Sequence, residues 1–136
     1  MEITISQEQG RVVVSVIQID GHLDSQTYQE LIAKAREVVK AGTKNILLDL
    51  SNLTYISSAG LVSLHTIALM TRGEEMSDPE QGWSTLKSMA SAREGGLQKH
   101  LKLLNPRPEI TKILDMVGFS EFFEVFTDKQ KAVDSF

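Results

Sequence analysis

The first twenty residues carry two hydrophobic patterns that are typical of β-strands. Ile3 and Ile5 alternate with polar residues, and after Gly10 the segment 11–19 is rich in β-branched side chains. Alternation is typical of a half-buried strand, and β-branched residues pack well on a pleated sheet. The sequence therefore predicts two opening strands joined by a tight turn at Gly10.

From residue 24 onward the apolar residues follow the spacing of a helix. Asp24 or Ser25 can cap the start of this helix, and Gly42 follows its last apolar residue. We therefore predict a first helix between Asp24 and Gly42. The side chains that share its apolar face are Tyr28, Leu31, Ile32, Ala35, Val38 and Val39.

Strand and helix patterns alternate through the rest of the chain. The apolar run at 45–50 predicts a central strand covered on both faces, and a second helix begins near Ser57 and Ser58 and ends near 71–73. The later elements are a strand at 100–104, a helix with an apolar stripe at Ile110, Ile113, Leu114 and Val117 that ends at Gly118, a strand at 122–126, and a terminal helix capped by Thr127 or Asp128.

The predicted fold class is therefore α/β in a single domain. Its elements follow the order strand, strand, helix, strand, helix, strand, helix, strand, helix. Such an order predicts a mixed, mostly parallel sheet with an N-terminal hairpin and about four helices packed against it.

Residues 74–95 do not follow this alternation. Polar residues and turn formers come first, and a helical stretch at 83–93 comes next. We interpret the segment as an insertion, which is either a tolerated surface loop or an additional partner contact. In the second case Trp83, Leu86 and Met89 form its apolar stripe.

Composition narrows the class of protein. The 136 residues contain no cysteine and carry a formal net charge of -4. Disulfides, thiolate metal sites and cysteine catalysis are thereby excluded, and we expect a cytoplasmic protein. Without a basic cluster or a long apolar stretch, we expect no direct contact with nucleic acid or membrane.

The histidines do not form a recognisable catalytic or metal-binding pattern. His22, His65 and His100 fall on different predicted elements, and the sequence has no phosphate-binding glycine loop. His65 follows Ser58 by seven residues, which is about 10 Å along a helix and too far for a general base. We therefore expect no enzyme activity, no cofactor and no metal, and hydrolase or transferase chemistry at Ser58 is the weakest hypothesis.

Ser57 and Ser58 are the most informative polar residues, because they stand where a strand pattern passes into a helix. A helix N-terminus offers free N–H groups and a positive dipole end, so the domain itself can accommodate a phosphoryl group there. The competing interpretation is that one of the hydroxyls only caps the helix.

The segment 49–61, Asp-Leu-Ser-x-Leu-x-Tyr-Ile-Ser-Ser-Ala-Gly-Leu, resembles the signature of the STAS domain, named for sulfate transporters and anti-sigma factor antagonists. Three further segments fit the same family: 21–24, 105–108 and 113–119. The resemblance implies one STAS domain over residues 1–136, with the insertion at about 74–95. The tyrosine and leucines of the signature are expected in the core.

The resemblance also implies a function by partner switching. The unphosphorylated protein would bind an anti-sigma factor serine kinase and release a sigma factor. The kinase would then phosphorylate Ser58, and a PPM-type serine phosphatase would reverse this step. Gly60 would allow close backbone approach, and the implied partner-binding residues are Asp24, Ser57, Ser58, Ala59 and Gly60.

Two alternatives stay open. The serine that the family phosphorylates is frequently preceded by Asp, whereas this chain has Ser57, so Ser57 is the alternative acceptor. The domain could also act as a sensory module for a small ligand or nucleotide, or as a switch that controls a target other than a sigma factor.

Overall fold

A six-stranded sheet organises residues 1–72 and 98–136, which are the residues that the structure, a computed structural model, describes. The predicted insertion at 74–95, its helical stretch at 83–93 and its apolar stripe lie outside the described residues. The strand order is β1-β2-β3-β5-β6, and β4 pairs with β2. The strands are β1 (Glu2–Gln9), β2 (Val13–Leu23), β3 (Ile46–Asp49), β4 (Leu53–Ile56), β5 (Leu101–Leu104) and β6 (Val125–Phe126).

The sheet is mostly parallel, as the alternation of strand and helix patterns predicts. Only the β1–β2 hairpin is antiparallel, whereas β3 and β4 run parallel to β2, and β5 and β6 continue the parallel order. The helices are α1 (Tyr28–Lys40), α2 (Ser58–Thr71), α4 (Pro108–Met116) and α5 (Lys129–Asp134), with a 3₁₀ turn, η1, at Phe119–Glu121.

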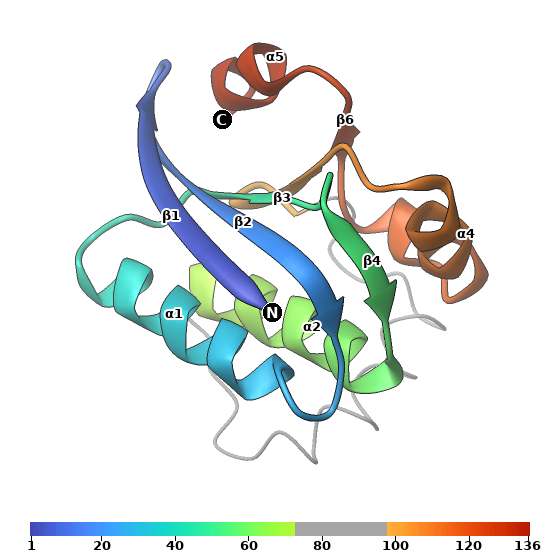
Figure 1. Cartoon of the computed structure of the whole chain (residues 1–136). Coiled ribbons are helices and arrows are strands. Elements are labelled where there is room, and N and C mark those ends of the chain that lie inside the picture. Colours follow the sequence, from blue (N-terminus) through green and yellow to red (C-terminus); the bar gives the residue numbers. More distant parts are fainter. Residues whose placement is uncertain (73–97) are drawn as a thin grey trace.

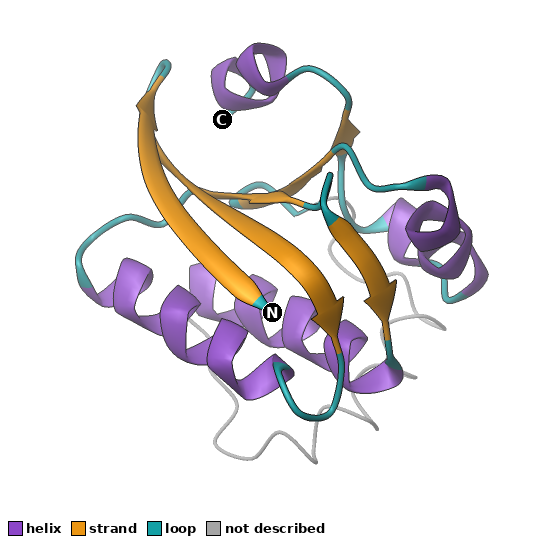
Figure 2. Cartoon of the chain, in the orientation of Figure 1, coloured by secondary structure: helices purple, strands orange, loops and turns teal. Residues whose placement is uncertain are grey.

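Helices cover both faces of the sheet. In Figure 1, α1 and α2 lie side by side on one face, and the short α5 lies on the other. Figure 2 shows the same layers coloured by element type. A single α/β domain with a mostly parallel sheet and an N-terminal hairpin is confirmed, and the described ranges contain four α-helices.

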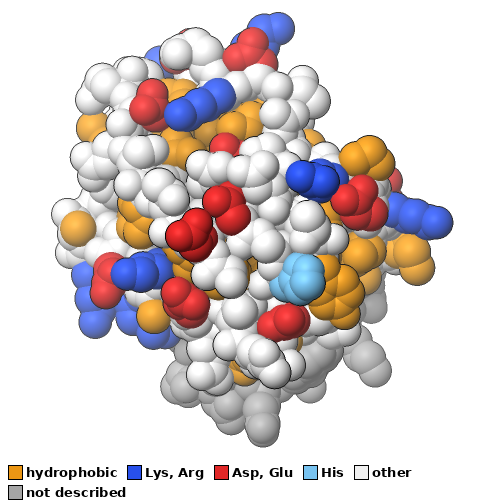
Figure 3. Space-filling model, in the orientation of Figure 1, with side chains coloured by type: hydrophobic (Ala, Val, Ile, Leu, Met, Phe, Trp, Pro, Cys, Tyr) orange, Lys and Arg blue, Asp and Glu red, His pale blue; other side chains and the backbone are white. Residues whose placement is uncertain are grey.

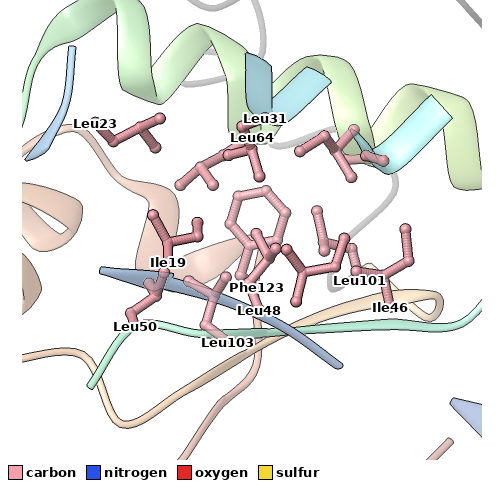
Figure 4. Close-up of a cluster of buried hydrophobic side chains, with 14 of the residues drawn as sticks. Ile19, Leu23, Leu31, Ile46, Leu48, Leu50, Leu64, Leu101, Leu103 and Phe123 are labelled. Atoms are coloured by element: carbon pink, nitrogen blue, oxygen red, sulfur yellow. The ribbon is translucent and has the colours of Figure 1, made fainter. Parts of the chain in front are cut away.

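The main core lies between the sheet and the pair α1 and α2 (Figure 4). Alternate residues of β3 serve two cores, because Ile46 and Leu48 face the main core and Leu47 faces α5. This confirms that 45–50 contains a central strand covered on both faces. The smaller cluster under α5 comprises Val14, Val16, Leu47, Leu104, Ala132 and Val133.

Two strands differ from the prediction. The expected strand at 122–126 is only Val125–Phe126, because Phe122 and Phe123 follow the 3₁₀ turn and are buried against Phe119. A strand would point Phe122 and Phe123 to opposite faces, whereas the turn lets both rings pack with Phe119 in the core. Separately, the segment 53–56, for which the sequence predicts no strand, forms β4.

The helix ends follow the sequence signals in most places. Gly42 and Gly118 have positive φ values of 106° and 82° just after α1 and α4, as expected of helix-terminating glycines. Asp128 caps α5, since its Oδ1 accepts hydrogen bonds from the backbone nitrogens of Gln130 and Lys131. Within 1–72 and 98–136, the helices are too short or too polar to span a bilayer.

Candidate functional site

The start of α2 holds the two serines that the sequence singles out. Ser57 is the N-cap residue, with extended backbone, and its Oγ accepts a hydrogen bond of 3.4 Å from the backbone nitrogen of Gly60. Ser58 is the first helical residue and its side chain is exposed, whereas Ser57 and Ala59 are half-buried. The capping role therefore belongs to Ser57, and the Ser58 hydroxyl stays accessible from outside.

Gly60 brings α2 against the end of β2. A Cβ atom at this position would lie 2.7 Å from the carbonyl oxygen of Leu23 and 2.6 Å from Cγ1 of Ile56. Real Cβ atoms do not approach so closely, so only glycine fits without displacing the backbone. The close backbone approach predicted for Gly60 is confirmed, and it places the serines beside the loop that follows β2.

Asp24 lies on that loop, but it does not cap α1. The first helical residue is Tyr28, and the residue before it, Thr27, makes no capping hydrogen bond with its side chain. Asp24 instead closes a turn ahead of the helix: its Oδ1 accepts a hydrogen bond of 2.9 Å from the backbone nitrogen of Gln26. The predicted cap at Asp24 or Ser25 is wrong, because the turn residues 25–27 separate Asp24 from the first helical residue.

Thr27 completes the turn and holds Asp24 in place. The backbone nitrogen of Asp24 donates to Thr27 Oγ1 at 2.9 Å, and this hydroxyl donates to the carbonyl oxygen of His22 at 2.9 Å. The half-buried Asp24 carboxylate therefore has a fixed position at the carboxyl end of β2. Polar groups at the carboxyl ends of parallel strands are a common way to build a site.

A bulge in β4 exposes an aromatic side chain next to the serines. Gly21 pairs with Leu53 but His22 pairs with Tyr55, so β4 contains one extra residue at this point. Thr54 and Tyr55 consequently both point outward, and Tyr55 is 49% exposed. The expectation that the signature tyrosine belongs to the core is wrong, whereas Leu50, Leu53 and Leu61 are buried as expected.

His22 and Tyr55 form an aromatic pair beside the serines, and the sequence analysis does not identify either of them as a site residue. Their rings meet edge to face at a centroid distance of 5.8 Å. The only sequence signal for this contact is the pair of residues between Leu53 and Ile56, which breaks the alternation of a regular strand. The surface around Ser58 thus combines a hydroxyl, a carboxylate and an exposed aromatic ring.

The remaining histidines lie elsewhere. His65 is buried in α2, and neither ring nitrogen has a hydrogen-bond partner among the described residues. Burial, and secondarily the positive charge of Arg72, lowers the pKa of His65. His100 Nδ1 lies 2.8 Å from Asn45 Oδ1 at the start of the strands, at the far end of the sheet.

The chain is similar in sequence to known proteins. The family model described as "Mlab, STAS domain" matches residues 6–77. BtrV of Bordetella bronchiseptica, a candidate anti-sigma factor antagonist by its name, is 24% identical to the chain over 136 residues, which cover the whole chain and 95% of BtrV.

Solved structures show the same fold. An anti-sigma factor antagonist from Mycobacterium paratuberculosis matches 97% of the chain and 92% of its own, with 18% identity and a TM-score of 0.62. The Bacillus cell fate determinant SpoIIAA in its phosphorylated form matches 98% of the chain and 97% of its own, with 18% identity and a TM-score of 0.55. The family match extends over more than half of the residues, from β1 through α2, and the chain therefore belongs to the STAS domain family.

Proposed function

We propose that this STAS domain is an anti-sigma factor antagonist, which binds an anti-sigma factor serine kinase and thereby releases a sigma factor. In the proposed cycle the kinase transfers the γ-phosphoryl group of ATP to the Ser58 hydroxyl, and the two proteins separate. A PPM-type phosphatase then hydrolyses the phosphoserine. The domain is a regulatory binding module and a kinase substrate, and it acts in the cytoplasm, where sigma factors are regulated.

The observation that carries this proposal is the exposure of Ser58 as the first residue of α2. A kinase can reach its hydroxyl, whereas Ser57 is half-buried and its Oγ already accepts a hydrogen bond from Gly60. Among the two serines, Ser58 is therefore the acceptor we propose. Asp24, Ser57 and Ala59 complete the partner-facing surface. Gly60, which the sequence also predicts as a partner-binding residue, is buried and instead allows α2 to pack against the end of β2.

The proposed switch depends on negative charge at Ser58, which the domain itself can accommodate and the interface with the partner cannot. At the start of α2, free N–H groups and the helix dipole accommodate negative charge within the domain. In a protein interface the same phosphoryl group brings about -1.5 to -2 charges that must be desolvated. If this costs about 2 to 5 kcal/mol, affinity falls by one to several powers of ten.

The comparisons support the proposal in two ways. The Bordetella relative, which is named as an anti-sigma factor antagonist, matches the whole chain over 95% of its own length. A structure with the same fold has been solved in a phosphorylated form, which supports a fold that tolerates a phosphoryl group. We further propose that residues 1–136 form one STAS domain, in which about 74–95 is an insertion.

Calorimetric titration of an anti-sigma factor kinase from the same organism tests the function. We expect tight binding by the wild type and by Ser58→Ala, and at least tenfold weaker binding by Ser58→Asp. Ser6→Asp is the matched control, because it adds the same charge at an exposed serine of β1. Equal affinities for Ser58→Asp and Ser6→Asp, or no binding of the wild type to any such kinase, would contradict the proposal.

A further inference from the structure

The outer edge of β1 is open. β1 pairs with β2 along its whole length, from Glu2 opposite Asp20 to Gln9 opposite Val13, and within 1–72 and 98–136 no strand pairs with its other side. Six of its eight residues are exposed. Figure 1 shows β1 as the border of the sheet. An edge of this kind presents unpaired N–H and C=O groups on which another strand can assemble.

A small apolar groove runs beside this edge, on the face of the sheet that α1 covers. Ile5, Val38 and Ala41 contribute its apolar walls, and its volume is about 190 Å³. Pockets for small molecules usually have about 300 to 1,000 Å³. The groove is therefore better suited to an apolar side chain that an added strand directs toward α1, since alternate side chains of a strand point to the same face.

The opposite face of the hairpin is acidic. Glu2 lies directly opposite Asp20, and Glu8 lies on the same face of β1 as Glu2. Figure 3 shows acidic side chains gathered over β1 and β2. The Nζ atom of Lys129 lies 4.0 Å from Oε2 of Glu8, but both side chains are more than 40% exposed, so this ion pair contributes little. Like charges directly opposite one another are unfavourable, and a cationic side chain added beside them relieves the repulsion.

A second copy of the chain is a poor occupant for this edge. If two β1 strands pair antiparallel about Ile5, Glu2 of each copy faces Glu8 of the other. That register sets four carboxylates in two repelling pairs at the ends of the contact. Charged residues on exposed edges commonly prevent such self-association. A basic strand from a different protein has the complementary charge.

We propose that the edge of β1 binds an extended, basic segment of a partner protein, which adds as a further strand to the sheet. In this segment Lys or Arg side chains lie over Glu2, Glu8 and Asp20, and an apolar side chain between them enters the groove at Ile5. β1 contributes none of the residues around Ser58, so this interaction is additional to the proposed switch and independent of it.

A labelled peptide with the sequence Lys-Val-Lys-Val-Lys-Val-Lys, blocked at both ends, is the probe. Its binding to the whole chain is followed by fluorescence anisotropy, and the site is mapped by amide chemical shifts and hydrogen exchange. We expect the amides of β1 to shift and to exchange more slowly. The Glu2→Lys, Glu8→Lys double variant should bind at least tenfold more weakly, and a peptide with Glu in place of Lys should not bind.

The control is the Glu30→Lys, Glu109→Lys double variant, which makes the same charge change at exposed positions of α1 and α4. Equal loss of affinity in both double variants would show attraction by net charge alone and would overturn the proposal. Shifts that map away from β1, or no binding at millimolar peptide, would overturn it as well. So would a concentration-dependent dimer of the wild type whose protected amides lie in β1.

Discussion

The backbone nitrogen of Ser57 donates a hydrogen bond of 2.9 Å to the carbonyl oxygen of Leu23. This bond ties the start of α2 to the end of β2, one residue before Asp24. Two polar segments that are more than thirty residues apart in sequence thereby form one surface. Because the backbone sets their spacing, changes to the exposed side chains should alter binding without disturbing the fold.

Phosphorylation should occur once, and on Ser58. We expect one added phosphate on the wild type and on Ser57→Ala after incubation with ATP and the partner kinase, and none on Ser58→Ala. Mass spectrometry of the intact protein and of its peptides checks this. A phosphate on Ser58→Ala, at position 57, would instead identify Ser57 as the acceptor.

Ser58→Asp should retain or increase the stability of the domain while it weakens kinase binding. A negative charge in the first turn of a helix is usually worth about 0.3 to 1 kcal/mol, and α2 has no acidic residue there. The free energy of unfolding in urea, measured at low ionic strength, checks this. A loss of more than 1 kcal/mol would mean that the fold does not tolerate charge at this position.

Gly60→Ala should destabilise the protein by about 1 to 3 kcal/mol, since the added Cβ collides with the Leu23 carbonyl and Ile56. Urea denaturation measures the effect. Ser58→Ala is the control, because it changes an exposed side chain two residues earlier in the same helix. If Gly60→Ala unfolds at the same urea concentration as Ser58→Ala, the close approach is not required.

His65→Leu should stabilise the protein and reduce its sensitivity to acid. Neither ring nitrogen of the buried His65 has a hydrogen-bond partner among residues 1–72 and 98–136, and an unsatisfied buried polar group usually costs about 1 to 3 kcal/mol, which leucine would remove. Because the pKa of His65 is lowered in the folded state, the unfolded chain binds a proton more readily. The unfolding free energy of the wild type should therefore be unaffected by His65 titration above about pH 6.5 and should decrease as the pH falls from there toward the lowered pKa.

The unfolding free energy of wild type and His65→Leu, measured between pH 5 and 8, tests this. The difference between them should grow as the pH falls below 6.5. His22→Leu is the control, because His22 is exposed. A difference for His65→Leu that does not change with pH would show that His65 is not held in its neutral form.

Asp128→Ala should weaken the attachment of α5 by about 1 kcal/mol, the usual value of an N-cap. Ala132 and Val133 of α5 cover the second core, so the loss should appear in global stability and in faster amide exchange in α5. Thr127→Ala should have little effect, because Thr127 does not cap the helix. Equal effects of the two variants would contradict the assignment of the cap to Asp128.

The sequence alone was sufficient to predict the features that depend on residues close together in the chain. Local periodicity predicts the β1–β2 hairpin and the central strand β3. Glycines with positive φ mark the C-terminal ends of α1 and α4. The position of Ser57 and Ser58 at the start of α2 has the same origin. A serine before an apolar helical run is a local signal, and the backbone N–H groups that it satisfies lie within one turn.

The tertiary structure decided what depends on residues distant in sequence. β4 is too short and irregular to be recognised alone, and its pairing with β2 across a bulge turns Tyr55 outward. Asp24 lies beside Ser57 and Ser58 because the carbonyl oxygen of Leu23 accepts a hydrogen bond from the backbone nitrogen of Ser57. In each case the contact partner lies some thirty residues away, so the free energy that selects the conformation is not encoded in the local pattern.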